Sequence, residues 1–278
     1  MTAFPATVLA KAPALQAACP SLLGPNDPPP FRAVNPTGRA PALLLADHAG
    51  RAFPESLGRL GLGEAPLDLH IAYDIGVEWM TRRLAELLDA PALIHAYSRL
   101  LLDPNRTLDD PTSICAISDG VVVPGNRQLT DAEAEARAEA FFHPYHDAIE
   151  AAIEGFADRG VSPAIISMHS FTPMMRGFER PWEVGILWGE DGRMPLPLME
   201  ALRGDGVVVG DNEPYSGRNM HGYTIETHAL ARALPNVLIE VRQDLIGTKA
   251  EAEAWAERLA PPLAALLEDP ELTRAAQT

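Results

Sequence analysis

The sequence has little cysteine and little positive charge. Its 278 residues include two cysteines, Cys19 and Cys115, which are too few for a disulfide framework or a cysteine-based zinc site. Lys and Arg number 22 against 38 Asp and Glu, and the resulting formal net charge of −16 disfavours binding to a phosphate backbone. We therefore expect a protein of the reducing cytoplasm with a small-molecule ligand and no nucleic-acid partner.

Long apolar runs and several catalytic motifs are also missing. No stretch approaches the roughly 18 apolar residues that a membrane helix requires, so we expect no membrane association. The absence of His-Glu-x-x-His and Gly-x-Ser-x-Gly motifs excludes a thermolysin-type site and a nucleophile elbow. The chain also lacks the Gly-x-x-x-x-Gly-Lys-Ser/Thr and Gly-x-Gly-x-x-Gly loops that bind nucleotide phosphates.

Proline is abundant, with 26 residues, nine of them in residues 1–41. This density predicts an extended arm over 1–41 that packs on the body of the protein. Residues 42–278 are then expected to form one catalytic α/β domain. Within it, the long polar segment 102–128 is typical of a loop that lines or covers a site.

From residue 42 onward, short apolar runs alternate with helical patterns, which predicts a layered α/β fold. The helical spacing of 74–88 places Val77, Met80, Leu84 and Leu87 on one face. Two capping boxes, Thr130 with Glu133 and Thr248 with Glu251, open further helices to about residues 157 and 267, and Pro144 is expected to kink the first. Strands are expected at 42–46, 92–96, 164–168, 184–188, 207–209 and 237–241.

Three of these runs are followed by side chains that bind metals or transfer protons. Asp47-His48 follows the first run, His169 follows 164–168, and Glu240 follows Val237-Leu238-Ile239. Ligands of open α/β sheets bind at the carboxyl ends of the strands, so these side chains are expected to meet. Two imidazoles and one carboxylate are the ligand set of catalytic zinc, and a second carboxylate would take a proton from water.

Seven ordered motifs give the chain a resemblance to the N-formylglutamate amidohydrolase family. The resemblance runs from Pro30 to about Leu267 and rests on Asp47-His48-Ala49-Gly50 with Pro54, His70-Ile71-Ala72-Tyr73-Asp74-Ile75-Gly76, Tyr97-Ser98-Arg99 with Asp103-Pro104-Asn105-Arg106, Pro144-Tyr145-His146, Ser167-Met168-His169-Ser170-Phe171-Thr172-Pro173, Asp211-Asn212-Glu213-Pro214-Tyr215-Ser216-Gly217 and Ile239-Glu240-Val241-Arg242-Gln243-Asp244. It implies a three-layer α/β/α sandwich with a mixed, mostly parallel sheet, similar to zinc carboxypeptidases and muramoyl amidases.

The resemblance also implies the ligands of one zinc ion: His48, Asp74 and His169, with Glu240 as general base. Asp68, His70 and Glu78 are alternatives to Asp74, and another divalent metal is an alternative to zinc. The implied reaction is attack of activated water on the amide of an N-formyl or N-acyl amino acid such as N-formylglutamate. His228 or Arg106 is expected to stabilise the oxyanion.

Arginines are expected to hold the substrate carboxylate, because the guanidinium fork matches its geometry. Arg106 is the first choice, and Arg99, Arg176 and Arg242 are the other candidates. Further substrate-binding candidates are Asn105, His146, Ser170, Tyr215, Ser216, Tyr223, Thr224 and Gln243. His95 and His143 are expected to be structural, and Trp182 and Trp188 to lie in the core.

The segment 212–224 departs from the Gly-rich pattern of the histidine-degrading members of the family, so the reaction class transfers better than the substrate. One alternative is a zinc amidase or carboxypeptidase that acts on peptidoglycan fragments or other N-acyl amino acids. Another is a non-catalytic binding protein on the same fold. We expect a monomer or a small homo-oligomer.

Overall fold

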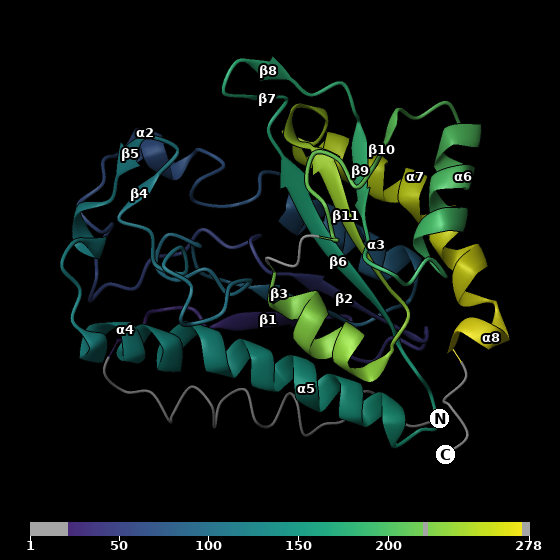
Figure 1. Ribbon diagram of the computed structural model, residues 1–278. Coiled ribbons are helices and arrows are strands. Elements are labelled where there is room, and N and C mark those ends of the chain that lie inside the picture. Colours follow the sequence, from purple (N-terminus) through teal and green to yellow (C-terminus); the bar gives the residue numbers. More distant parts are fainter. Residues whose placement is uncertain (1–21, 219–221, 274–278) are drawn as a thin grey trace.

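The computed structural model describes residues 22–218 and 222–273, so the first 21 residues of the arm predicted over 1–41 lie outside the described residues. A mixed sheet of seven strands lies between two layers of helices (Figure 1). The strands, in their order across the sheet, are β1 (Phe31–Val34), β3 (Ala92–His95), β2 (Ala42–Ala46), β6 (Ala164–Phe171), β11 (Asn236–Arg242), β9 (Val184–Leu187) and β10 (Val209–Asp211). The four central strands β3, β2, β6 and β11 are parallel, and the flanking strands run the opposite way.

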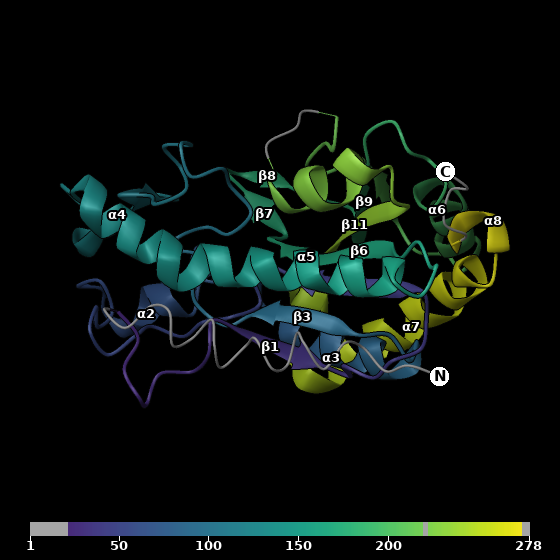
Figure 2. The ribbon, with the colours of Figure 1, turned by 90° about the horizontal axis from the view of Figure 1, so that it is seen from below.

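Helices cover both faces of the sheet, so the predicted three-layer α/β/α class is confirmed. One layer consists of α3 (Val77–Leu87), α6 (Pro195–Gly204) and α7 (Lys249–Leu267), and the other consists mainly of α5 (His143–Ala157) (Figures 1 and 2). The remaining helices are α2 (Glu64–Leu67), α4 (Asp131–Arg137) and α8 (Pro270–Thr273). No helix in the described ranges is long and apolar enough to cross a membrane.

The sequence of β2 shows how the layers form. Its five residues are fully buried, as expected for a parallel strand covered on both faces. Because side chains alternate along a strand, Leu43 and Leu45 pack against α5, while Leu44 packs in the core formed with α3 and α7. The two hydrophobic cores therefore share one sheet.

Both predicted capping boxes are confirmed, and they begin α4 and α7. α4 continues into α5 through a π-helical turn, η2 (Ala138–Phe142), which widens the helix directly before Pro144. Pro144 has no N–H to donate to the preceding turn, and it lies in the first turn of α5, directly after this π-helical turn.

Three local predictions differ from the structure. Residues 31–34 belong to the sheet as the edge strand β1, antiparallel to β3, rather than to an extended arm. A strand of four residues that pairs on one side only leaves a weak sequence signal. Leu87 is 40% exposed, because it lies at the end of α3 where the helix leaves the core. Strand β10 begins at Val209 rather than Val207.

One face of the sheet is only partly covered by a helix. α5 packs over β1, β3 and β2, whereas β6 and β11 are contacted by η3 (Ile225–Ala229), a short π-helical turn. The segment 102–128 folds into loops and a small hairpin of β4 (Ile117–Ser118) and β5 (Val121–Val122) beyond the sheet edge. A second hairpin, β7 (Met174–Met175) with β8 (Phe178–Glu179), follows β6.

Candidate metal centre and its pocket

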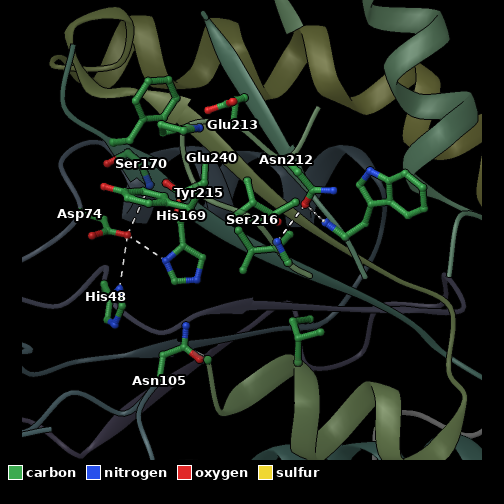
Figure 3. A pocket seen from close by; sticks show the side chains of 18 of the residues that line it. His48, Asp74, Asn105, His169, Ser170, Asn212, Glu213, Tyr215, Ser216 and Glu240 are labelled. Carbon is green, nitrogen blue, oxygen red and sulfur yellow. Dashed lines mark hydrogen bonds and ion pairs between the residues drawn. The ribbon is translucent and has the colours of Figure 1, made fainter. Parts of the chain in front are cut away.

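Three buried side chains meet beyond the carboxyl ends of β2 and β6. His48 follows β2, His169 lies near the end of β6, and Asp74 precedes α3. Asp74 Oδ2 is 2.9 Å from His169 Nδ1 and 3.6 Å from His48 Nδ1 (Figure 3). One ligand atom from each residue lies within 4.8 Å of the other two, so a single ion can be held by all three.

Two glycines of the sequence motifs allow the loops to bring these residues together. A Cβ on Gly50 would lie 2.1 Å from the carbonyl carbon of Ala96, so only glycine lets the loop after His48 pass against the end of β3. Gly76 has φ +81° at the N-terminus of α3, and a Cβ there would lie 2.1 Å from Ile246 O. The turn that carries Asp74 therefore requires glycine.

A carboxylate lies behind each imidazole. Asp103 Oδ1 is 2.7 Å from His48 Nε2, whereas His169 Nε2 lies 3.1 Å from Ser167 Oγ, its hydrogen-bond partner, and 3.6 Å from Asp47 Oδ2. The Tyr145 hydroxyl donates a hydrogen bond of 2.8 Å to Asp47 Oδ1 and so fixes that carboxylate. Such partners orient metal-binding histidines and raise their basicity, and both imidazoles thus present Nδ1 to Asp74.

The electrostatics of the cluster favour ionised carboxylates. Burial raises the pKa of Asp47, but the nearby charged imidazole of His169 outweighs it and lowers that pKa to about 2. Burial likewise opposes the ionisation of Asp103, yet the charges of Arg99 and His48 hold its pKa well below its usual value. The three ionised carboxylates, Asp47, Asp74 and Asp103, form an anionic cage around the imidazoles that Arg99 only partly neutralises and that would attract a divalent cation.

The donor set fits zinc. Two imidazole nitrogens and one carboxylate oxygen are a known ligand set for catalytic zinc, which keeps a further position for water or substrate. His48 Nδ1 is buried without a hydrogen-bond partner among the described residues, as expected for a lone pair that is directed at a metal. A second group of this type in the described ranges, Glu135, Glu139 and His143, lies on a helix surface.

Glu240 lies directly beside the candidate ligands. It pairs in register with His169 on the adjacent parallel strand, and its side chain is directed into the pocket (Figure 3). Burial, reinforced by the negative charge of Asp74, raises the pKa of Glu240 to about 7. Its Oε2 is buried without a hydrogen-bond partner among the described residues, so it is placed to exchange a proton with a ligand in the pocket.

These residues open into a pocket of about 670 Å³ over β6, β11 and β9. Of the other residues predicted to act on the substrate, the pocket brings together Arg99, Asn105, Arg106, Ser170, Tyr215 and Ser216. Arg99 binds the Asp103 carboxylate and lies 3.5 Å from Asp74 Oδ1, so much of its charge is neutralised within the site. Arg106 lies at the same end of the pocket.

Asn105 is held in a single orientation. Its Oδ1 accepts hydrogen bonds from Tyr223 N at 2.8 Å and Thr224 N at 3.1 Å, which are backbone donors just before η3. Because a carbonyl oxygen accepts and an amide nitrogen donates, these bonds assign the two ends of the side-chain amide. The Nδ2 group is then directed into the pocket (Figure 3).

The structure places the other predicted residues outside the pocket lining. His146 and His228 stack behind the wall, with His146 Nδ1 2.9 Å from His228 Nε2, and the Tyr223 ring packs against His146. Arg242 donates hydrogen bonds to the backbone carbonyls of residues 180–182 and so holds the loop before β9 in place. The remaining two, Thr224 and Gln243, are buried or half-buried nearby but do not line the cavity.

The alternatives to Asp74 lie apart from the histidine pair. Asp68 pairs with Arg51, and Glu78 pairs with Arg32 and Arg82. His70 lines the pocket but faces Asp119 at 3.4 Å. Arg176 lines a smaller neighbouring cavity of about 280 Å³. His95 is fully buried in β3, with its ring nitrogens near the backbone oxygens of Tyr97 and Phe141.

Several residues of the site escaped the sequence interpretation. The roles of Asp47 and Asp103 behind the imidazoles are invisible without the fold, although both belong to the motifs with His48 and Arg106. Trp188, predicted in the core, lines the pocket together with Leu187 and Leu238. The sequence contains one indication that Leu238 lines the pocket. Side chains alternate along a strand, so Leu238 lies on the same face of β11 as Glu240.

Comparison with known proteins places the chain in a family. The family model of N-formylglutamate amidohydrolase matches residues 40–247. A solved structure of the gene product Atu2144 from Agrobacterium tumefaciens is 31% identical and covers 90% of this chain and 99% of its own, with a TM-score of 0.86.

An N-formylglutamate amidohydrolase from Ralstonia eutropha JMP134 is 21% identical and shares the fold, with a TM-score of 0.64 over 86% of this chain and 95% of its own. None of the curated proteins matches the sequence. The family model matches well over half of the chain. The chain therefore belongs to the N-formylglutamate amidohydrolase family, whose members are amidohydrolases.

Proposed function

We propose that the protein is a zinc-dependent amidohydrolase that cleaves the amide bond of an N-formyl or other N-acyl amino acid. The observation that carries the proposal is the gathering of His48, Asp74 and His169 donor atoms within 4.8 Å of one another, beside Glu240. Family membership supports amide hydrolysis, and the buried donor set supports the metal.

His48, Asp74 and His169 would hold the ion. Zinc held by such a set supplies Lewis-acid chemistry, because it makes water nucleophilic near neutral pH and polarises a carbonyl. Asp103 keeps the His48 ring in orientation through its contact with Nε2, and Ser167 does the same for His169, with the Asp47 carboxylate 3.6 Å away. Arg99, paired with Asp103 and Asp74, limits the negative charge of the cage.

Glu240 is the proposed general base and acid. With its pKa raised to about 7, its carboxylate takes a proton from the attacking water and returns it to the nitrogen of the departing amino acid. The water oxygen forms the new bond to the acyl carbon, the C–N bond breaks, and the products are a carboxylic acid and a free amine. No other proton carrier is needed in this scheme.

Asn105 replaces His228 as the proposed oxyanion donor. Its Nδ2 faces the pocket and is held by the two bonds to Oδ1, so it needs no reorganisation as charge develops on the carbonyl oxygen. His228 lies behind the wall, bonded to His146. Arg106 is the proposed partner of the substrate carboxylate at the same end of the pocket.

Release of free amine from N-formyl and N-acetyl amino acids, measured on the zinc-loaded protein, tests the proposal. We expect hydrolysis that is abolished by a chelator and restored by added zinc. Zinc-loaded protein that releases amine from none of these substrates would contradict the proposed activity, and hydrolysis that a chelator leaves intact would contradict the role of the metal.

A further inference from the structure

The pocket continues well beyond the catalytic residues along strand β11. Asn236, Leu238 and Glu240 alternate on one face of this strand and all line the cavity. Each pair of residues advances a strand by about 7 Å, so the floor extends about 13 Å from Glu240 to Asn236. A formyl group would leave nearly all of this length unfilled.

This extension of the pocket has apolar walls. Leu238 pairs in register with Leu187 of β9, and both line the cavity with Trp188, Ile225 and Leu230. Leu238 is only half-buried, whereas its neighbours Val237 and Ile239 on the opposite face of the sheet are fully buried. The exposed part of Leu238 therefore faces the cavity. We call these five lining residues, Leu187, Trp188, Ile225, Leu230 and Leu238, the apolar end.

A few polar groups lie near the apolar end. Asn236 Nδ2 donates to Leu234 O at 2.9 Å, and Asn212 Oδ1 accepts from Trp188 N and Gly217 N. Asn212 Nδ2 is a buried donor with no partner among the described residues, and Arg218 lies over the Trp188 ring, 5.1 Å from its centre. Two acidic residues, Glu213 and Glu226, also line the pocket and would repel a carboxylate. The four aliphatic side chains of this end, Leu187, Ile225, Leu230 and Leu238, outnumber these polar groups and match an apolar substrate group.

The two arginines that line the pocket, Arg99 and Arg106, lie at its other end. Arg99, Arg106 and His70 line both the main pocket and the smaller cavity of about 280 Å³ beside it. Arg99 belongs to the cluster of Asp74 and Asp103 beyond β2 and β3, whereas the apolar end lies over β11 and β9. Figure 3 shows Asn212, which accepts a hydrogen bond from the backbone of Trp188, across the pocket from His48 and Asp74.

We propose that the preferred substrates are amino acids whose nitrogen carries a hydrophobic acyl chain. The inference rests on the proposed function and specifies its substrate class. The carboxylate of an amino acid lies close to its amide nitrogen, so binding of that carboxylate at Arg106 directs the amino acid to the cationic end. The acyl chain then extends from Glu240 over Leu238 into the apolar end, and hydrolysis releases a fatty acid and the free amino acid.

A series of substrates with one amino acid and increasing acyl length tests the inference. We expect kcat/KM of the zinc-loaded protein to rise about fourfold for each added methylene from acetyl toward octanoyl, the value for burial of a methylene. A series in which the formyl or acetyl substrate is cleaved as well as the longer ones would overturn the inference and leave the proposed function standing. Failure to cleave any member would overturn both.

Substitutions in the apolar end test whether its residues cause the preference for long acyl chains. Leu238→Ala and Leu230→Ala, from the floor and the wall, should each lower the octanoyl-to-acetyl ratio of kcat/KM about tenfold. Leu87→Ala, a leucine that is 40% exposed at the end of α3, is the matched control and should keep the wild-type ratio. A ratio unchanged in both pocket variants, with their folding verified by circular dichroism, would contradict the assignment.

Binding without turnover supplies an independent measurement. Calorimetric titration of the zinc-loaded Glu240→Gln variant with the N-octanoyl amino acid should give a Kd well below that of the N-acetyl compound, and a more negative heat capacity change. Equal affinities for the two compounds would contradict burial of the chain in the apolar end.

Discussion

Asp103 Oδ1 lies 2.7 Å from His48 Nε2, so the outer nitrogen of one candidate metal ligand is bound to a buried carboxylate. The same carboxylate accepts the Asn105 backbone N–H at 2.9 Å and pairs with Arg99. One aspartate thus connects the metal cage, the proposed oxyanion donor and the cationic end of the pocket.

This contact predicts a loss of metal affinity without loss of a metal ligand. Asp103→Asn should weaken zinc binding about 10- to 100-fold, because the imidazole loses its anionic partner. Competition against a chromophoric chelator measures the affinity. Asp109→Asn, an exposed aspartate of the same loop, is the matched control. Wild-type zinc affinity in Asp103→Asn would show that the contact does not support the metal.

Glu240→Gln should separate metal binding from catalysis. The variant keeps the shape of the side chain but removes the proton acceptor, so kcat should fall about 10²- to 10⁴-fold while the zinc content stays at the wild-type value. Glu200→Gln, on the exposed face of α6, controls for the loss of one charge. A fully active Glu240→Gln enzyme would exclude the proposed base.

Asn105→Asp tests the oxyanion donor with little structural change. An aspartate oxygen can still accept the backbone N–H groups of Tyr223 and Thr224, but the group directed at the pocket changes from a donor to an acceptor. We expect kcat to fall about 10²- to 10³-fold with a smaller change in KM. A change confined to KM would indicate that Asn105 only binds the substrate.

The stacked pair of His146 and His228 predicts acid destabilisation. Burial lowers the pKa of His146 to about 3, helped by the charge of His228, and burial lowers the pKa of His228 to about 4 although Glu150 opposes this. Between these values and the unfolded pKa of about 6.5, the unfolded chain binds more protons than the folded chain. Stability therefore falls as the pH drops below 6.5, by up to about 1.4 kcal/mol per pH unit for each histidine.

Urea unfolding between pH 4.5 and 7 measures this effect. The double variant His146→Gln, His228→Gln should show a shallower dependence of the free energy of unfolding on pH than the wild type. His143→Gln removes a ring with 41% side-chain exposure from the start of the same helix and serves as control. An unchanged pH slope in the double variant would contradict the account of the pair.

The sequence predicted the layers of the fold well because its local signals agree with the tertiary structure. The buried run of β2 and the two capping boxes are formed by residues close together in the chain, and all three are confirmed. The edge strand Phe31–Val34 escaped prediction because its identity depends on pairing with residues 92–95, far along the chain. Leu87 was predicted to lie on the buried face of its helix but is 40% exposed. It is the last residue of α3, and the sequence does not show whether the last turn of a helix still contacts the core.

The candidate site was predictable where it follows strand ends. His48, His169 and Glu240 come together because parallel neighbours bring their carboxyl ends to one edge. The contact between Asp103 and His48 joins loops 55 residues apart, and no local pattern reveals it. The placement of His228 behind the wall depends on how η3 is rotated, which periodicity within so short a turn does not determine.

The most direct test of the metal centre is the zinc content of the purified protein, measured by elemental analysis without exposure to a chelator. The account predicts about one zinc per chain, and its loss in the His169→Ala variant, since three protein ligands are the minimum of a catalytic zinc site. A protein that contains no divalent metal, and takes up none when zinc is added, would contradict the central claim.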